Sequence, residues 1–270
     1  MSTAQPAARI SRVMYELVPR IITVSSVEQL TPRMRRVAFV GDDLATFTTK
    51  SPEDHVKLVF PLEDGSLPVF PPREGQPRPV TRDYTPRRFD VASRTLVIDF
   101  VVHGTGVASD WARRAEPGMR LGLAGPRGSI IVADDFDWYL AVGDETALPS
   151  IARRLEEAPA GQKIVAVIEV EDTDEEQEIA TAADATVVWV HRNGVPAGTT
   201  SFLMDTVREL ALPEGEGFTW VEGEATTVRD IRRYLLNERG FDRGLSRFSG
   251  HWKRGVANHD HHAPIDEDDE

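Results

Sequence analysis

The residue pattern of this chain changes its period near Asp134–Asp137, and this change limits the fold more than any other feature. Before it, short strand-like runs follow one another, many with alternating apolar and polar residues. After it, strand-like runs alternate with helical repeats, which is typical of a parallel sheet covered by helices. We therefore expect two domains, and a length of 270 residues agrees with that number.

Turn signals such as Asp64-Gly65 and Pro117-Gly118 separate the strand-like runs of the first part. The six runs are Arg20–Val27, Met34–Val40, His55–Phe60, Arg82–Phe89, Thr95–His103 and Met119–Ala124. Short strands at this spacing predict a six-stranded antiparallel β-barrel.

The second part is predicted to form an α/β domain with a parallel sheet. Its predicted strands are Tyr139–Val142, Lys163–Glu169, Thr186–His191, Thr219–Glu222 and Ser246–Gly250. Its predicted helices are Leu148–Ala158, Ser201–Leu210 and Thr226–Arg239. Apolar residues recur at helical spacing in the first and last of these, and Gly240 is a natural stop for the last one.

These patterns divide the chain into four segments. We expect an N-terminal extension (1–11), a barrel domain (12–134), an α/β domain (135–255) and an acidic, disordered tail (256–270). His259, His261 and His262 lie in the tail, and histidine-rich tracts can bind metal. The acidic, proline-containing surroundings instead favour a solvating tail, so we expect no metal site.

Composition excludes several classes of function. The chain has no cysteine, which rules out disulfides, cysteine-ligated iron–sulfur clusters and a cysteine nucleophile. The net charge of −13 argues against nucleic-acid binding. No apolar run has the length of a membrane span, and the first residues do not read as a secretory signal, so we expect a cytoplasmic protein.

The run Arg82-Asp83-Tyr84-Thr85 offers a cation, an aromatic ring and a hydroxyl group in an extended segment. Arg82 and Tyr84 would share one face of a strand. A flavin dinucleotide needs such a set, with a charge for its pyrophosphate, a flat ring for its isoalloxazine and a hydrogen-bond partner for N5. Short motifs have many chance matches, so alone this run favours an ordinary surface strand.

The segment from His103 to Ala112 follows a predicted barrel strand. Gly104 and Gly106 would let the backbone approach a ligand, and Ser109 is expected to cap a short helix that begins there. A helix N-terminus suits a pyrophosphate. A capped surface helix after a glycine turn explains the same residues equally well.

Two loops of the second part follow predicted parallel strands, where open α/β sheets bind their ligands. The first runs from Gly143 to Pro149 and lacks the usual dinucleotide fingerprint, so it could be a simple capping turn with Thr146 as the cap. The second contains Glu224, which could act as a base, contact a ribose or cap the helix starting near Thr226. Without support from the other predicted site residues, we favour the role of Glu224 as a helix cap.

Taken in order, five motifs make the chain resemble the siderophore-interacting protein family of FAD-dependent ferric-siderophore reductases, within the ferredoxin–NADP reductase superfamily. The motifs are His55-Val56-Lys57-Leu58 with Phe60-Pro61, Arg82 to Arg87, His103-Gly104 through Trp111-Ala112, Gly143 to Pro149, and Gly223-Glu224 followed by Trp252 to Gly255. The resemblance covers about Arg12 to Gly255. Two residues depart from the pattern: Val107 replaces a usual proline, and His251 a usual tyrosine.

The resemblance implies that Arg82 pairs with a phosphate of FAD, that Tyr84 stacks on the isoalloxazine and that Thr85 lies near N5. The cofactor-binding residues that it implies are Arg82, Asp83, Tyr84, Thr85, His103, Gly104, Gly106, Val107, Ala108, Ser109, Gly143, Asp144, Glu145, Thr146, Ala147 and Glu224. The residues that it places toward a ferric siderophore are Lys57, Lys253 and Arg254, which by themselves would count as surface charges.

The implied reaction is hydride transfer from NADPH or NADH to FAD, followed by reduction of iron(III) to iron(II) in the siderophore. Glu169, Glu171 and Asp172 end the second predicted parallel strand and favour NADH, whereas Arg192 could compensate for a 2′-phosphate. Two alternatives remain: a flavin oxidoreductase that exchanges electrons with a ferredoxin, and a siderophore carrier without catalytic activity.

Overall fold

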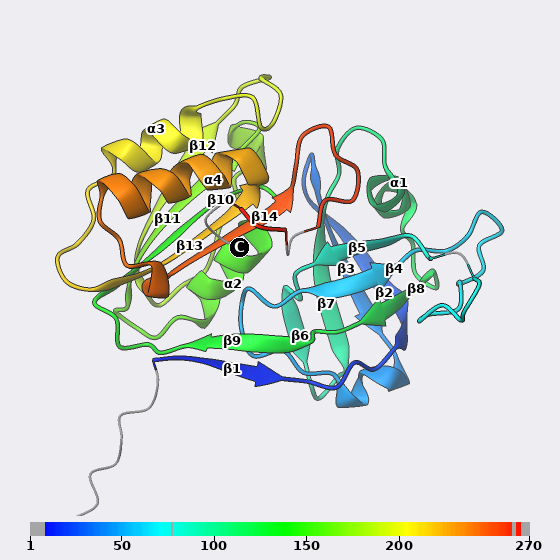
Figure 1. Ribbon diagram of the computed structural model, residues 1–270. Coiled ribbons are helices and arrows are strands. Elements are labelled where there is room, and N and C mark those ends of the chain that lie inside the picture. Colours follow the sequence, from blue (N-terminus) through cyan, green and yellow to red (C-terminus); the bar gives the residue numbers. More distant parts are fainter. Residues whose placement is uncertain (1–8, 77, 261–262, 266–270) are drawn as a thin grey trace, which may run out of the picture. The chain divides into compact units, whose positions relative to one another are not determined.

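The computed structural model describes residues 9–76, 78–260 and 263–265. The contacts divide this chain into two units (Figure 1). The first takes in the chain up to Glu28 together with Arg35–Asp135, and the second comprises Gln29–Met34 and the chain from Phe136 onward.

The first unit contains nine strands, one α-helix and a short 3₁₀ helix in its described residues. They are β1 (Ile10–Met14), β2 (Arg20–Thr31), β3 (Met34–Val40), η1 (Asp42–Thr46), β4 (Val56–Val59), β5 (Thr81–Tyr84), β6 (Arg88–Asp90), β7 (Thr95–Val101), α1 (Val107–Arg114), β8 (Arg120–Ala124) and β9 (Gly128–Val132). The main sheet has seven strands in the order β5-β4-β8-β2-β3-β7-β6, and β1 pairs with β9 in a second, two-stranded antiparallel sheet.

The predicted antiparallel domain is confirmed, but its strand count differs from six. The expected strand Arg82–Phe89 is interrupted at Thr85–Arg87, because Pro86 has no N–H to donate to a ladder. β5 pairs with β4 and β6 pairs with β7, so the two pieces lie at opposite ends of the sheet order. Three residues span at most about 14 Å between these ends, which requires the sheet to curl back on itself.

An aromatic cluster fills the curled sheet. Trp111 of α1 packs against Phe39, Phe60 and Phe100, with ring centroids 5.5 to 6.1 Å apart. All four side chains are buried. Because Trp111 anchors α1 in this cluster, the loop before the helix is fixed at the rim of the sheet.

The second unit contains a five-stranded sheet in the order β12-β11-β10-β13-β14, with parallel pairing throughout. Its elements are β10 (Trp138–Asp144), α2 (Leu148–Glu157), β11 (Lys163–Val170), η2 (Thr173–Glu175), β12 (Asp184–His191), α3 (Phe202–Glu209), β13 (Gly217–Glu224), α4 (Ala225–Arg233), a π-helical segment η3 (Tyr234–Glu238), η4 (Arg243–Leu245) and β14 (Ser246–Trp252). The predicted parallel domain is confirmed. The strand order reverses between β10 and β13, which is the point where open α/β sheets bind ligands.

Helices cover both faces of this sheet. Leu140 and Val142 of β10 belong to one buried cluster with residues of α3 and α4, which lie side by side in Figure 1. Gly143 of the same strand lies against α2. Since successive residues of a strand point to opposite faces, α2 covers the other side. Every residue of β10 is buried, as expected for a central parallel strand.

The predicted disordered tail is wrong in part. Lys253 and Val256 form an isolated antiparallel bridge, and the amide of Ala263 donates to the carbonyl of Asp260 at 2.9 Å. Ile265 is partly buried against the cluster under α3 and α4. The contact removes apolar surface of Ile265 from water, which favours an ordered position for this residue. His261 and His262 lie outside the described residues.

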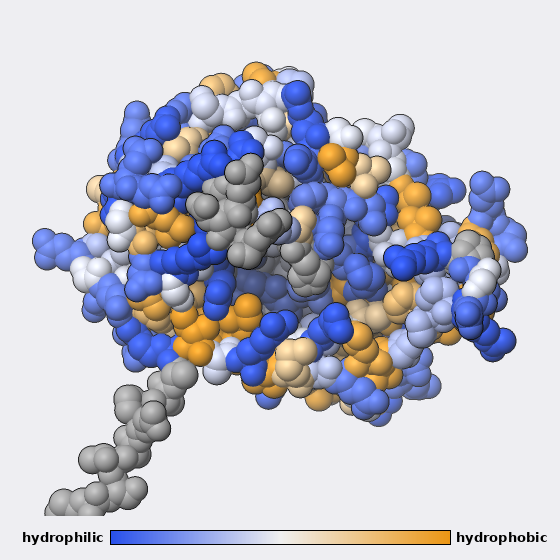
Figure 2. Space-filling view, viewed as in Figure 1, coloured by the Kyte–Doolittle hydropathy of each residue, from blue (hydrophilic) through white to orange (hydrophobic). Residues whose placement is uncertain are grey.

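The surface in Figure 2 is mainly hydrophilic on the face shown, with smaller apolar areas between the polar side chains. This agrees with a mean hydropathy of −0.32. No helix in the described part of the chain combines the length and apolar character that crossing a membrane requires.

Candidate functional site

Arg82, Asp83 and Tyr84 end strand β5, which pairs with β4 in antiparallel register. Tyr84 is half-buried, and its ring lies on that of Phe100 with centroids 4.5 Å apart. Burial raises the pKa of the Tyr84 phenol above its ordinary value, so the ring stays neutral. Thr85 follows in the link that crosses to β6.

Lys57 stands opposite Asp83 in the β4–β5 register. The two side chains form an ion pair, with Nζ 2.8 and 2.9 Å from the carboxylate oxygens of Asp83. Both are partly exposed, so the pair contributes little to stability. It does change the expected role of Lys57, because a neighbouring carboxylate already balances its charge.

The loop between β7 and α1 leaves room beside its glycines. Among the described residues, and apart from the two chain neighbours, no heavy atom comes within 4 Å of the position that a Cβ would take at Gly104 or at Gly106. Gly104 has φ +36°, a conformation that other residues seldom adopt. Val107, at the first position of the helix, is exposed. The protein's own packing therefore does not explain these two glycines.

Ser109 does not cap this helix, contrary to the sequence prediction. The cap residue is Gly106, and Ser109 lies inside the first turn with its side chain buried. Its hydroxyl donates to the carbonyl of Val101 at 3.4 Å and accepts from the amide of His103 at 3.3 Å. Ser109 thus ties the helix back to β7, and the amide groups at the N-terminus of α1 lack a hydroxyl cap.

Two charged residues of α1 complete the loop. Asp110 accepts from the amide of Gly106 at 3.3 Å and pairs with Arg113 at 2.6 Å. Arg113 also donates to the carbonyl of Gly104. Burial, with a smaller contribution from the charge of Arg113, lowers the pKa of His103. His103 is therefore a neutral side chain beside a cationic one at neutral pH.

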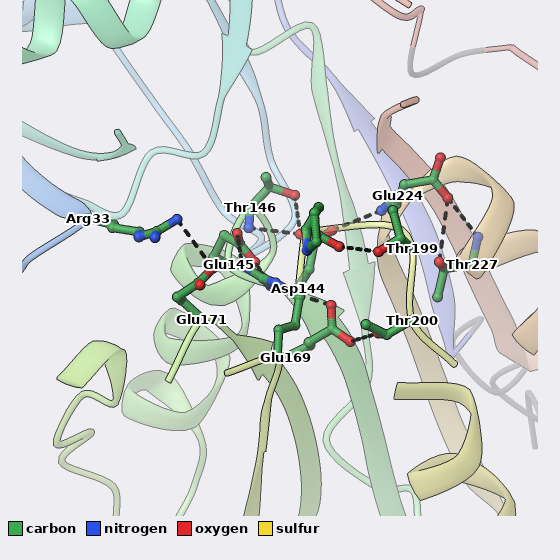
Figure 3. Close-up of polar contacts among 12 residues, drawn as sticks. Arg33, Asp144, Glu145, Thr146, Glu169, Glu171, Thr199, Thr200, Glu224 and Thr227 are labelled. Carbon is green, nitrogen blue, oxygen red and sulfur yellow. Dashed lines mark hydrogen bonds and ion pairs between the residues drawn. The ribbon is translucent and has the colours of Figure 1, made fainter. Parts of the chain in front are cut away.

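Asp144 is the centre of the site in the second unit (Figure 3). One carboxylate oxygen accepts from the amide and hydroxyl of Thr146 at 2.8 and 2.6 Å. The other accepts from the amide of Glu224 at 2.9 Å and from Nε1 of Trp252 at 2.8 Å. Asp144 is buried, and its four bonds join the ends of β10, β13 and β14.

Gly143 and Ala147 are packed without space between them. A Cβ at Gly143 would lie 2.3 Å from Cβ of Ala147 and 2.7 Å from the carbonyl oxygen of Glu222. Ala147 is completely buried and is the N-terminal cap residue of α2, the position expected for Thr146. Its side chain holds the loop in place, and a bulky residue there would disrupt packing.

Arg192 follows β12 and is bound by three carboxylates from two chain segments, the residue after β10 and the end of β11. It makes two hydrogen bonds to Glu145, at 2.7 and 2.8 Å, and lies 3.4 Å from Glu169 and 3.3 Å from Glu171. Its side chain is 1% exposed. The sequence left open that Arg192 compensates for a 2′-phosphate, and in the structure its charge is already neutralised inside the protein.

Glu224 caps α4, as the simpler interpretation of the sequence predicts. One oxygen accepts from the amides of Thr226 and Thr227 at 2.7 and 2.9 Å, and the other accepts from the amide of Arg254 at 3.2 Å. The side chains of Lys253 and Arg254 are exposed in the turn that follows β14.

A pocket lies among the carboxyl ends of β10, β11 and β13. Its polar lining consists of Asp144, Glu169, Thr200, Glu222, Glu224 and Thr227. Among the residues that the structure describes, no group of three or more acidic or histidine side chains could hold a metal ion. The pocket thus offers oxygen acceptors and hydroxyl groups at the edge where a nucleotide is expected.

Sequence reasoning missed three residues of this site. Trp252 donates to Asp144, Thr200 donates to Glu169 at 3.0 Å, and Arg33 pairs with Glu171 at 3.2 Å. Trp252 stood inside a recognised motif, although its role did not follow from it. Arg33 gave no signal, since it lies in a hairpin turn more than a hundred residues away in sequence.

Comparison with known proteins also finds two domains in the chain, with the change between residues 130 and 136. Residues 23–130 match the siderophore-interacting FAD-binding domain, and residues 136–255 match the siderophore-interacting protein family. The chain is 32% identical to the NADPH-dependent ferric-chelate reductase of Escherichia coli over 89% of this chain and 95% of that one. It is 30% identical to the ferric vibriobactin reductase ViuB of Vibrio cholerae over 94% and 96%, respectively.

A solved structure agrees with these matches. The siderophore utilization protein from T. fusca is 44% identical, covers 94% of this chain and all of its own, and superposes with a TM-score of 0.88. Reductases such as the ferredoxin reductase of carbazole 1,9a-dioxygenase share the fold at 17% identity and a TM-score of 0.63. The matched domains, their order and the shared fold show that this chain belongs to the siderophore-interacting protein family.

Proposed function

We propose that this protein is an FAD-dependent reductase that uses NADPH or NADH to reduce the iron(III) of a ferric siderophore and so releases iron(II). The names of its relatives support this reaction, since one is an NADPH-dependent ferric-chelate reductase and another a ferric vibriobactin reductase. The observation that carries the proposal is a chain that combines the family's FAD-binding domain with an α/β domain whose pocket lies at the switch point of its sheet.

The first unit fits a flavin dinucleotide. The space beside Gly104 and Gly106 lies at the start of α1, where amide groups attract a pyrophosphate. Tyr84 offers a neutral, half-buried ring that suits an isoalloxazine, and Arg82 supplies a cation two residues before it. FAD, when bound, takes up electrons in pairs and passes them on singly. The protein's part is to bind and orient it.

The second unit fits a nicotinamide nucleotide. Asp144 of the Gly143–Thr146 loop and Glu224 line the pocket, and Asp144 accepts hydrogen bonds from the amides of Thr146 and Glu224, which fixes the backbone there. A loop that is already ordered can bind a nucleotide without the entropic cost of ordering the loop itself. Ala147 supports the loop from behind.

Iron(III) chelates often carry negative charge, and the protein itself carries −13. A local group of cations must therefore offset the overall field. We propose Lys253 and Arg254 of the second unit for this role, and Lys57 of the first unit as a separate candidate. Lys57 brings the least net charge, because Asp83 is paired with it.

The proposal is tested by anaerobic stopped-flow absorbance of the purified yellow protein. NADH or NADPH should bleach the flavin, and ferric siderophores should restore its colour. Tyr84→Ala should alter the flavin spectrum, and Arg82→Ala should weaken FAD retention. A colourless protein that binds no FAD would contradict the proposal. If only a reduced ferredoxin bleaches the flavin, the electron donor is a ferredoxin and not NADH or NADPH.

The cationic group is tested with one anionic and one neutral ferric chelate. Lys253→Ala should raise the apparent KM for the anionic chelate several-fold and leave the neutral one unchanged. The difference should shrink as salt rises, because exposed charges are screened over about 8–10 Å at physiological ionic strength. Equal changes for both chelates would rule out an electrostatic role.

A further inference from the structure

Three neighbouring parallel strands of the second unit bring four charged side chains together, and a hairpin turn adds a fifth. Glu145 follows β10, Glu169 and Glu171 stand at the end of β11, and Arg192 follows β12. Arg33 comes from the β2–β3 turn, which belongs to the same unit. Because the carboxyl ends of parallel strands meet at one edge, these residues form a single network (Figure 3), and its member Glu169 also lines the pocket.

The guanidinium of Arg192 is already paired with carboxylates of the protein, so it is not available to a ligand. Glu145 holds it at two nitrogens, Glu169 and Glu171 lie within 3.4 Å, and the guanidinium is 1% exposed. Burial alone would lower the pKa of Arg192, but its bonds to Glu145 and the three carboxylate charges raise it above its ordinary value. Its Nε is buried without a hydrogen-bond partner among the described residues. Displacing its carboxylates would leave a buried, uncompensated charge.

The network as a whole is negative. Its three carboxylates outnumber its two guanidinium groups by one, and Asp144 adds a further negative charge at the same edge. Burial raises the pKa of Glu145 and Glu169, while contact with Arg192 acts in the opposite direction. Glu145 and Glu171 keep 19% and 11% of their side chains exposed, so they are the members of the network most open to a ligand outside it.

This chemistry distinguishes the two nicotinamide donors. The ribose of NADH carries free hydroxyl groups, which donate to carboxylates, and an acidic residue at the end of the second strand is the usual partner of a ribose 2′-hydroxyl. The 2′-phosphate of NADPH brings up to about two negative charges to an edge whose buried cation is already paired. We infer that the Glu145–Glu169–Glu171–Arg192 network makes this pocket selective for NADH over NADPH; the inference rests on the proposed function.

The test compares two ligands that differ only in the 2′-phosphate. Calorimetry on the FAD-loaded, full-length protein with ADP-ribose and 2′-phospho-ADP-ribose measures binding without any reaction. We expect ADP-ribose to bind at least about tenfold more tightly, which corresponds to ~1.4 kcal/mol. Flavin reduction should show the same preference, with a higher kcat/KM for NADH than for NADPH.

Two variants should shift this preference in opposite directions. Glu171→Gln removes one negative charge and should narrow the difference between the ligands several-fold. Arg33→Ala removes a half-exposed cation and should widen it. Glu157→Gln is the matched control, because it makes the same charge change in an ion pair at the far end of α2 and should leave the difference unchanged. Thermal unfolding of each variant checks that it is folded.

Tighter binding of the phosphorylated ligand, or equal shifts in Glu171→Gln and Glu157→Gln, would overturn the inference. If NADPH reduces the flavin faster than NADH, the selectivity is wrong and the reductase function stands. If neither ligand binds and neither nucleotide reduces the flavin, the nicotinamide donor itself is wrong and the inference falls with it.

Discussion

Two glycine-containing loops follow strands in the two units, and their glycines exist for different reasons. Around Gly104 and Gly106 in the first unit, none of the residues that the structure describes occupies the space that a Cβ would need. At Gly143 in the second, a Cβ would collide with Ala147 and with the backbone of β13. The second loop therefore needs glycine for the protein's own packing. The first leaves space that a ligand can use.

The same contrast holds for the polar groups. In the second loop, the carboxylate of Asp144 accepts four hydrogen bonds, all from donors within the protein. The first loop begins a helix whose cap residue, Gly106, has no side chain to offer. A preformed loop and a loop that awaits a partner thus differ in what their own residues leave unsatisfied.

The largest effect should come from Gly143→Ala. The new methyl group would press on Ala147 and on the carbonyl of Glu222, and neither can move without shifting α2 or β13. We expect the free energy of unfolding to fall by about 3 kcal/mol, as for other overpacked cores. Urea denaturation measures it. A loss below about 0.5 kcal/mol would show that the loop is not close-packed.

Asp144→Asn should have the next largest effect. An amide would direct its NH₂ group at donors that now share a carboxylate, so at least one buried N–H would lose its acceptor. We expect a loss of about 2 kcal/mol in the free energy of unfolding. Asp137→Asn is a suitable control, since Asp137 also accepts from a backbone amide but at an exposed position. Equal losses in both variants would argue against a special role for Asp144.

Gly106→Ala should affect FAD binding more than folding stability, the reverse of the two substitutions above. Gly106 has φ 161°, which any residue can adopt, and there is free space beside it. We expect the flavin-free protein to lose no more than about 1 kcal/mol, from a poorer helix cap, while the Kd for FAD rises about tenfold, or ~1.4 kcal/mol. Fluorescence titration with FAD measures the second quantity. An unchanged Kd would mean that the space beside Gly106 does not serve FAD.

The smallest effect concerns His103. Its pKa is lowered in the folded protein, so its contribution to stability is complete above the unfolded value of about 6.5 and is lost as pH falls below it. Between pH 7.5 and 5.5 the wild type should lose more stability than His103→Gln. An anionic pyrophosphate nearby would raise the pKa again, so the difference should shrink when FAD is bound. A difference that FAD leaves unchanged would place the ligand elsewhere.

Periodicity predicted most of the fold. The apolar runs of β10 and β11 and the repeats of α2 and α4 are local signals, and they gave the parallel domain nearly to the residue. β1 and β9 were missed because they pair with each other across more than a hundred residues. The break at Pro86 was missed because the strand-like residues on its two sides formed one continuous run.

The site was predictable as a set of segments, not as a set of contacts. The spacing of Gly143 to Thr146 located a loop at the sheet edge. It could not show that Asp144 is saturated or that Arg192 is enclosed by three carboxylates. Such facts depend on which strands become neighbours, and only the folded chain decides that. Ser109 illustrates the same limit, since its place in the helix was shifted by three residues from the predicted cap.

The short segment Gln29–Met34 has a consequence for recombination. In sequence this segment interrupts the first unit, but by its contacts it belongs to the second. Thr31 donates to the buried Glu175 at 2.5 Å, and Arg33 pairs with Glu171. A chimaera joined at Asp135 would therefore pair Glu175 and Glu171 with a foreign hairpin. The exchangeable unit of this protein is discontinuous, and a transplanted α/β domain should work best when six residues from the other half of the gene travel with it.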